Sequence, residues 1–233
     1  FQVLKLVLKK LGYEWSDNIF HLSYGMVELP EGKMKSREGT VVDADDLIAD
    51  MVGTAREMSQ ELGKLDGVSE EEAAAISEMV GLGALKYFIL KVDPKKTMLF
   101  DPRESIDFNG NTGPFIQYTH ARIRSILRKA EESGITTEGY AKAELLPEEI
   151  ELIKALSEYP ATVRVAGQQF APSVIAAYAY DLAKQFNGYY HDHSILKEER
   201  TEVRALRLML ASEVARVIRS AMSLLGINVP ERM

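Results

Sequence analysis

Two lysines and a serine stand close together in a glycine-bounded loop, at Lys33, Lys35 and Ser36 within residues 31–40. Ammonium groups and a hydroxyl that converge in such a loop can hold the phosphates of a nucleotide. A short run of charge is equally typical of a solvated hairpin tip. Charge alone therefore leaves both interpretations open.

Aromatic and cationic residues suited to RNA occur in the second half of the chain. Tyr118 and Arg122 are four residues apart, so they share one face of a helix and suit base stacking combined with phosphate contact. The alternative is a tyrosine packed in a junction beside a solvated arginine. Tyr189, Tyr190 and His193 follow an Asn-Gly pair, and exposed aromatics in a loop suit stacking on splayed bases. The alternative there is that one of the two tyrosines packs into the protein.

The chain contains few residues of the types, Cys and His, that usually bind transition-metal ions. It contains no cysteine, which excludes disulfides and thiolate metal sites and permits a cytoplasmic setting. The histidines are His21, His120, His191 and His193. The last two are separated by one residue, a spacing that suits neither a helical ligand pair nor a closed structural site. We expect no metal site.

The bulk composition allows a sizeable core. The chain has 233 residues, of which 46% are hydrophobic, and a net charge of −7. A negative total does not exclude a nucleic-acid partner, because local patches decide electrostatic binding. No unbroken run of 18 apolar residues occurs, so we expect no membrane partner. The chain begins Phe-Gln-Val with neither an initiator Met nor a signal pattern, and we expect it to be a piece of a longer protein.

The first half must position the cationic loop. Helical spacing predicts a helix over 1–11, and strand formers over 19–29 predict a strand that leads into the loop. Asp43 begins a helix that extends to about residue 62, with Asp46 in the capping-box position, and Ser69 with Glu72 is a stronger capping box for a helix over 70–90. A short strand and a helical turn near 102–106 follow.

The second half reads as helices throughout. Thr112 precedes Gly-Pro and predicts a helix start, and Pro160 predicts a helix end. We expect a loop at 187–193. The expected helices are 114–133, 147–158, 161–170, 172–186 and 198–225. The chain therefore divides near residue 112, and its second part is an all-helical bundle.

Three separated stretches resemble one family. Lys33-Met34-Lys35-Ser36 resembles the Lys-Met-Ser-Lys-Ser signature of class I aminoacyl-tRNA synthetases with one residue missing. Residues 109–122, from Asn-Gly-Asn-Thr-Gly-Pro to Thr-His-Ala-Arg, closely resemble the arginyl-tRNA synthetase stretch that joins the catalytic core to the anticodon domain. Residues 204–207, 224–227 and 230–233 are similar to the anticodon domain named after its Asp-Ala-Leu-Arg motif, although Arg204 replaces the Asp.

The resemblance implies a mainly α protein with two parts. Residues 1–111 would be a short α/β remnant of a Rossmann-type catalytic domain, and residues 112–233 an all-α anticodon-binding bundle. The implied activity is arginine–tRNA ligase, with ATP (with Mg²⁺), arginine and the tRNA for arginine as partners, in a cytoplasmic monomer. The His-Ile-Gly-His type motif of the family is absent from these residues, so we expect the chain to be inactive alone. The alternative is a stand-alone tRNA-binding helical module without catalysis.

The resemblance also implies roles for single residues. Lys33, Lys35 and Ser36 would act on the phosphates of ATP, together with Gly32 and Met34 of the same loop. His21, Met26 and Val27 would lie against the adenine, although an ordinary half-buried strand explains them equally well. The implied tRNA contacts are Gln117, Tyr118, Arg122, Tyr189, Tyr190, His193 and the terminal Met233.

Overall fold

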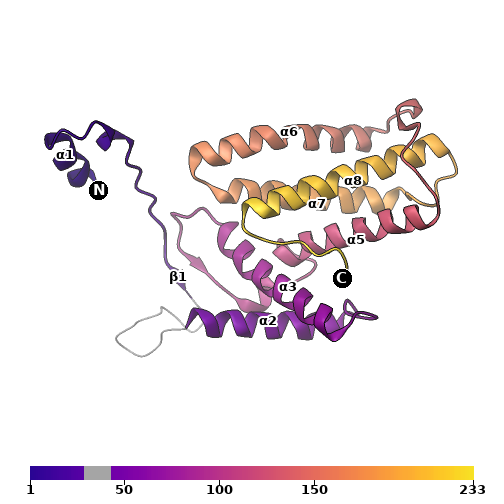
Figure 1. Cartoon of the computed structure of the whole chain (residues 1–233), viewed down its shortest axis with the longest axis horizontal. Helices are drawn as coiled ribbons and strands as arrows, with labels where there is room; N and C mark the ends of the chain where they lie inside the picture. The colour runs from indigo at the N-terminus through magenta and orange to yellow at the C-terminus, as the bar shows by residue number, and fades with distance from the viewer. Residues whose placement is uncertain (29–42) are drawn as a thin grey trace.

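The protein is mainly helical, as the sequence predicts (Figure 1). The structure, a computed structural model, describes residues 1–28 and 43–233. The predicted phosphate loop, with Gly32, Lys33, Met34, Lys35 and Ser36, lies outside these residues. The helices of the first half are α1 (Gln2–Lys10), η1 (Glu14–Asn18), α2 (Ala44–Glu61), α3 (Glu70–Leu90) and α4 (Pro102–Ser105). Those of the second half are α5 (Gly113–Glu132), η3 (Tyr140–Lys142), α6 (Pro147–Gln169), α7 (Pro172–Asp192) and α8 (Thr201–Leu224).

The predicted strand at 19–29 is wrong in extent. Only β1 (Val27–Glu28) pairs, in parallel, with β2 (Met98–Leu99), and Val27 lies opposite Met98. A strand needs a partner for its backbone groups, and among the described residues these two positions are where one is found. Just before β1 the chain approaches residues 94–97 so closely that a Cβ on Gly25 would lie 2.2 Å from the Lys96 carbonyl oxygen.

The first half has its own apolar cluster, built mainly by α2, α3 and the segment after β2. Met51, Val80, Phe88, Phe100 and Ile106 are among its buried members. Side-chain caps begin both long helices as predicted: Asp43 accepts from the amide of Asp45, and Ser69 from that of Glu72. The Asp46 capping box is not formed, because Asp43 is engaged by the residue two positions on.

Helix α3 links the two halves. By length and composition it could cross a membrane, but half of its apolar stretch is buried inside the protein. Its Tyr87 belongs to the apolar cluster of the second half, whereas Val80 and Phe88 belong to that of the first. The contacts of α3 with α2, α5 and α7 are those of a core helix. The division near residue 112 stays a prediction, since both clusters include residues of α3.

The second half is a bundle of the long helices α5, α6, α7 and α8, which lie side by side in Figure 1. Thr112 caps α5 as predicted, by accepting a hydrogen bond from the amide of Phe115. Gly226 follows α8 with φ +67°, a left-handed conformation that glycine adopts without strain.

The predicted helix end at Pro160 is wrong, since α6 continues through it to Gln169. Proline removes one helical hydrogen bond, but the turn that precedes it is anchored to α7. Tyr159 stacks on Tyr178 with ring centroids 5.4 Å apart, and the Tyr178 hydroxyl donates to the Ala155 carbonyl at 2.9 Å. Packing therefore outweighs the lost bond.

The predicted loop at 187–193 is also wrong, because α7 runs to Asp192. Asn187 is held within the helix by two tertiary bonds: its Nδ2 donates to Thr119 Oγ1 at 2.8 Å, and Arg122 donates to its Oδ1 at 2.7 Å. Tyr189 extends the buried face that Phe186 begins. Long-range contacts thus override the turn tendency of Asn-Gly.

Candidate nucleic-acid interface

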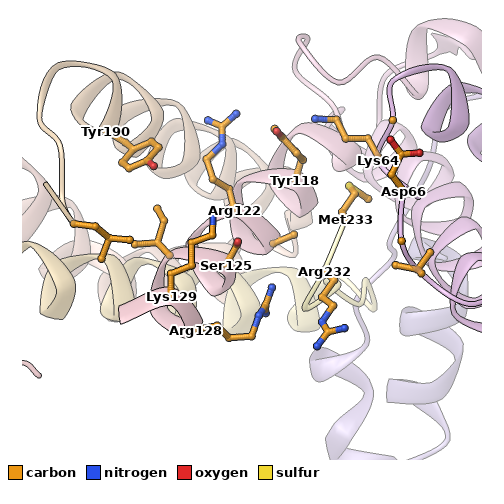
Figure 2. Close-up of a pocket in the computed structure, with 16 residues that line it drawn as sticks. Lys64, Asp66, Tyr118, Arg122, Ser125, Arg128, Lys129, Tyr190, Arg232 and Met233 are labelled. Atoms are coloured by element: carbon orange, nitrogen blue, oxygen red, sulfur yellow. The ribbon is translucent and has the colours of Figure 1, made fainter. Parts of the chain in front are cut away.

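A cleft of about 440 Å³ lies between α5, the turn that joins α2 to α3, and the C-terminal tail (Figure 2). Tyr118 and Met233 line it from α5 and from the chain end, and Asp66 lines it from the turn. Its cationic side chains are Lys64, Arg122, Arg128, Lys129 and Arg232. A chain with a net charge of −7 thus presents a locally basic hollow, which suits an anionic ligand.

Tyr118 is the aromatic centre of this cleft. The Nζ atom of Lys64 lies 3.4 Å from its ring centroid, and the Arg122 guanidinium lies 4.7 Å from it. Burial raises the pKa of the Tyr118 hydroxyl, but the hydrogen bonds and charges of Lys64 and Arg122 outweigh burial and lower that pKa overall. Phe108 packs edge-on against the ring at 6.4 Å and fixes its plane.

A second hollow continues from the first along α7. Arg122 and Tyr190 line both, and Asn187, His191, Ser194 and Lys197 complete the second. Tyr190 stacks on Phe186 with ring planes 5° apart, so its orientation is set from the core. Two tyrosines with cations between them form a surface on which bases can stack while their phosphates are neutralised.

Two residues of the predicted RNA set are engaged inside the protein. Gln117 is fully buried, and its Nε2 donates to the carbonyl oxygens of Met79 at 2.9 Å and Asn228 at 2.8 Å. Tyr189 is buried and donates to Oε1 of Glu149 at 2.8 Å. Burial and this hydrogen bond raise the pKa of Tyr189, so its hydroxyl keeps its proton. Neither side chain faces the cleft.

The other predicted residues keep an accessible side chain. Tyr118, Arg122, Tyr190 and Met233 line the hollows, and Figure 2 shows Met233 beside Tyr118 and Lys64. His193 is half-buried, with its ring centroid 5.1 Å from that of Tyr189. This separation of Tyr189 from Tyr190 agrees with the sequence alternative in which one of the pair packs into the bundle.

The predicted adenine contacts lie in the N-terminal segment. His21 stacks on Phe1 at 3.9 Å and is exposed, as is Met26, while Val27 is half-buried in β1. Their relation to the phosphate loop stays a prediction, since that loop lies outside the described residues. Over residues 1–28 and 43–233, no group of three His, Cys, Asp or Glu side chains lies close enough to hold a metal ion.

Four cations of the cleft were not predicted from the sequence as site residues: Lys64, Arg128, Lys129 and Arg232. Lys64 stands in the turn between α2 and α3, which has left-handed glycines at 63 and 67. Lys64 and Tyr118 are more than fifty positions apart in the sequence, so no local pattern predicts their contact. Arg232 belongs to the terminal motif at 230–233, but the sequence does not indicate which surface its side chain lines.

The C-terminal tail reaches the cleft along α5. His120 is buried, and its Nδ1 lies 2.9 Å from the carbonyl oxygen of Pro230. Burial, together with the charges of Arg219 and Arg124, lowers the pKa of His120 to about 4 against the opposing effect of the bond to Pro230. The ring is therefore neutral at pH 7, with its Nδ1 proton donated to the tail.

Comparison with known proteins now defines the class. The family model "DALR anticodon binding domain" matches residues 116–233, and the chain belongs to this family. Residues 1–101 match "tRNA synthetases class I (R), catalytic domain". The resemblance predicted from the sequence is thereby confirmed.

Particular relatives agree over the whole chain. It is 61% identical to an arginine–tRNA ligase of Bacteroides fragilis and 56% identical to one of Flavobacterium psychrophilum, each match covering 100% of this chain. The chain spans 39% and 38% of the lengths of these relatives. Its fold matches Thermus thermophilus arginyl-tRNA synthetase with a TM-score of 0.86 at 33% identity, over 98% of this chain and 38% of that one.

Proposed function

We propose that this chain is the C-terminal part of an arginine–tRNA ligase, which attaches arginine to its tRNA with consumption of ATP. The observation that carries the proposal is the 61% identity, along the entire chain, to relatives bearing that name. The basic cleft with Tyr118 supports it independently, because the anticodon-binding part of such an enzyme must hold unpaired RNA bases.

The two halves would contribute to different steps. In the first step the arginine carboxylate attacks the α-phosphate of ATP, and pyrophosphate leaves. Lys33, Lys35 and Ser36 would stabilise the charge that builds on the phosphates. Mg²⁺ would enter with ATP, bound chiefly by the phosphates. In the second step the terminal ribose hydroxyl of the tRNA takes the arginyl group, and AMP leaves.

The bundle would hold the anticodon arm in the two hollows. Bases would stack on Tyr118 and Tyr190, and Arg122 between them would meet the backbone phosphate. A base entering at Tyr118 must displace the Lys64 ammonium from the ring, which leaves that cation free to pair with phosphate. The binding energy is then mainly electrostatic, so it falls as salt rises.

A stand-alone tRNA-binding module is the second candidate. The 233 residues, which span 39% of the length of the Bacteroides fragilis relative, contain no His-Ile-Gly-His type motif and are compatible with either candidate. The reading frame upstream of these residues in the gene decides between the two. The ligase requires the motif there, and a frame without it would leave only the binding module. For the polypeptide alone we expect no aminoacylation, a monomeric state and a cytoplasmic setting.

The test is a titration with arginine tRNA, and with the same tRNA carrying a scrambled anticodon, at two salt concentrations. If the five cleft cations meet five phosphates of a single strand, log K should fall against log salt with a slope of about −3.5. We expect weaker binding of the scrambled tRNA. Equal binding of both, or no salt dependence, would contradict anticodon recognition.

The catalytic proposal needs the complete enzyme. There Lys35→Ala should slow adenylate formation by about 100- to 1,000-fold, which is typical for one lost contact to developing charge, and should leave tRNA affinity unchanged. The opposite pattern would remove Lys35 from the phosphate site.

A further inference from the structure

One face of α5 holds the C-terminal tail by a row of hydrogen bonds. Gln117 Nε2 donates to the Asn228 carbonyl at 2.8 Å, and His120 Nδ1 to the Pro230 carbonyl at 2.9 Å. About two turns further along α5, Arg128 Nη1 donates to the Glu231 carbonyl at 2.8 Å. These donors share one helix face because successive ones are spaced by three and by eight residues, close to one and two helical turns. Side chains of α5 therefore bind the tail through its carbonyl oxygens at residues 228, 230 and 231.

The carboxylate of Glu231 adds two ionic contacts to this row of hydrogen bonds. It accepts from Arg124 Nε at 2.5 Å on α5, and its other oxygen accepts from Arg219 on α8. Arg219 also lies 3.4 Å from Nε2 of the neutral His120. Glu231 is thus the point at which α5, α8 and the tail are joined by charge.

Two residues beyond this junction the chain ends in the cleft. Arg232 and Met233 both line it, and Met233 also packs against the apolar cluster of the first half. Because Arg124 and Arg219 hold Glu231, they fix the point from which Arg232 and Met233 enter the cleft. We propose that Glu231 is a positioning residue for RNA recognition, which acts by holding Met233 beside Tyr118. The proposal rests on the proposed function, because it assigns Met233 a contact with RNA.

A simpler role for Glu231, that of neutralising two arginines, predicts a different result. If it only neutralised Arg124 and Arg219, its removal would expose two cations, and every RNA would bind more tightly by the same factor. If it positions Met233, its removal lowers the discrimination between RNAs. The ratio of two affinities therefore separates these roles, since a uniform electrostatic gain cancels in it.

The experiment compares variants of the whole 233-residue chain. The Kd values for arginine tRNA and for the tRNA with a scrambled anticodon are measured at one salt concentration for wild type, Glu231→Ala, Met233→Ala and the double variant. Glu213→Ala is the matched control, because Glu213 is a partly exposed acid of α8 that pairs with Arg216 and does not touch the tail. Thermal unfolding of each variant is followed in parallel.

We expect Glu231→Ala to lower the discrimination ratio about tenfold, as much as Met233→Ala, which is the effect of losing one partly buried apolar contact. The double variant should lower it no further, since both changes remove the same contact. Glu213→Ala should keep the wild-type ratio. Glu231→Gln, which retains an acceptor oxygen, should restore part of the ratio.

Two results would overturn the inference. One is a wild-type ratio in Glu231→Ala, whether or not both affinities rise. The other is an equal loss of affinity for both tRNAs together with a lower unfolding temperature, which would make Glu231 a purely structural residue. A wild-type chain that does not discriminate at all would instead refute the proposed function.

Discussion

Arg207 and Glu149 face each other inside the helical bundle, with Nε of Arg207 3.4 Å from Oε1 of Glu149. Their side chains are 6% and 0% exposed. Tyr189 donates to the same carboxylate oxygen, and Arg207 Nη1 donates to the Ser194 carbonyl at 2.7 Å. The final arginine of the family's name motif is therefore an interior tie between α6, α7 and α8.

Breaking this pair should be costly. Arg207→Met leaves the Glu149 carboxylate buried without its ion-pair partner, and we expect unfolding free energy to fall by about 3–5 kcal/mol. Adding Glu149→Gln should cost less than the sum of the two single changes, because the unpaired charge is then gone. Chemical denaturation measures both effects.

The control for that experiment is a pair at the surface. Arg216 and Glu213 are an exposed ion pair three residues apart on α8. Arg216→Met should leave stability nearly unchanged, because an exposed ion pair is screened by solvent and contributes little. If Arg207→Met and Arg216→Met lowered the free energy of unfolding equally, burial would not be the reason for the cost of breaking the interior pair.

The crossing of α2 and α3 depends on a glycine. A Cβ on Gly81 would lie 2.9 Å from the Met51 carbonyl oxygen and from backbone atoms of Val52. These are backbone atoms, which cannot move out of the way by a change of rotamer. The resulting overpacking in Gly81→Ala should destabilise the protein by about 1–3 kcal/mol. Thermal or denaturant unfolding reports the change.

Gly53 offers the matched substitution. It lies within α2 with nothing within 4 Å of its would-be Cβ. Gly53→Ala should therefore stabilise the protein by about 0.5–1 kcal/mol, through the lower entropy of the unfolded chain. The two alanines should thus shift the midpoint in opposite directions, and shifts of the same sign would contradict this account of Gly81.

His120 should make stability depend on pH. Its pKa is about 4 in the folded protein, below the value near 6.5 of an unfolded chain. The unfolded state binds the proton first as pH falls, so this contribution is complete above pH 6.5 and is lost down to about pH 4. The loss attributable to this ring is about 3 kcal/mol.

The effect can be isolated by comparison with His120→Gln. Glutamine can donate to the Pro230 carbonyl but does not titrate, whereas carboxylates contribute equally to both proteins. The groups facing the ring, Arg219, Arg124 and the Glu231 carboxylate, are the same in the two. Parallel stability curves between pH 4 and 6.5 would show that His120 does not lose its proton on folding.

Arg122 should account for about one phosphate contact. It lines both hollows and is held toward them by its bond to Asn187. Arg122→Ala should weaken tRNA binding and make the slope of log K against log salt less steep by about 0.7–0.9. Arg216→Ala, an exposed arginine absent from both hollows, should leave the slope unchanged. An unchanged slope in Arg122→Ala would remove Arg122 from the interface.

Local chemistry in the sequence determined most helix starts and the family. Ser69 and Thr112 cap their helices as predicted, because a cap needs only the residues next to it. The motifs at 109–122 and 230–233 identified the family for the same reason, since each can be read from a continuous stretch.

Only the tertiary structure decided where helices pass a breaker and which residues meet. Helix α6 continues through Pro160 and α7 through Asn187-Gly188, because contacts with other helices exceed the local cost. The cleft unites Lys64, Tyr118 and Met233 from three distant parts of the chain. Packing energy is shared among residues far apart in sequence, so no local pattern reveals that Gln117 and Tyr189 turn inward while Tyr118 and Tyr190 remain accessible.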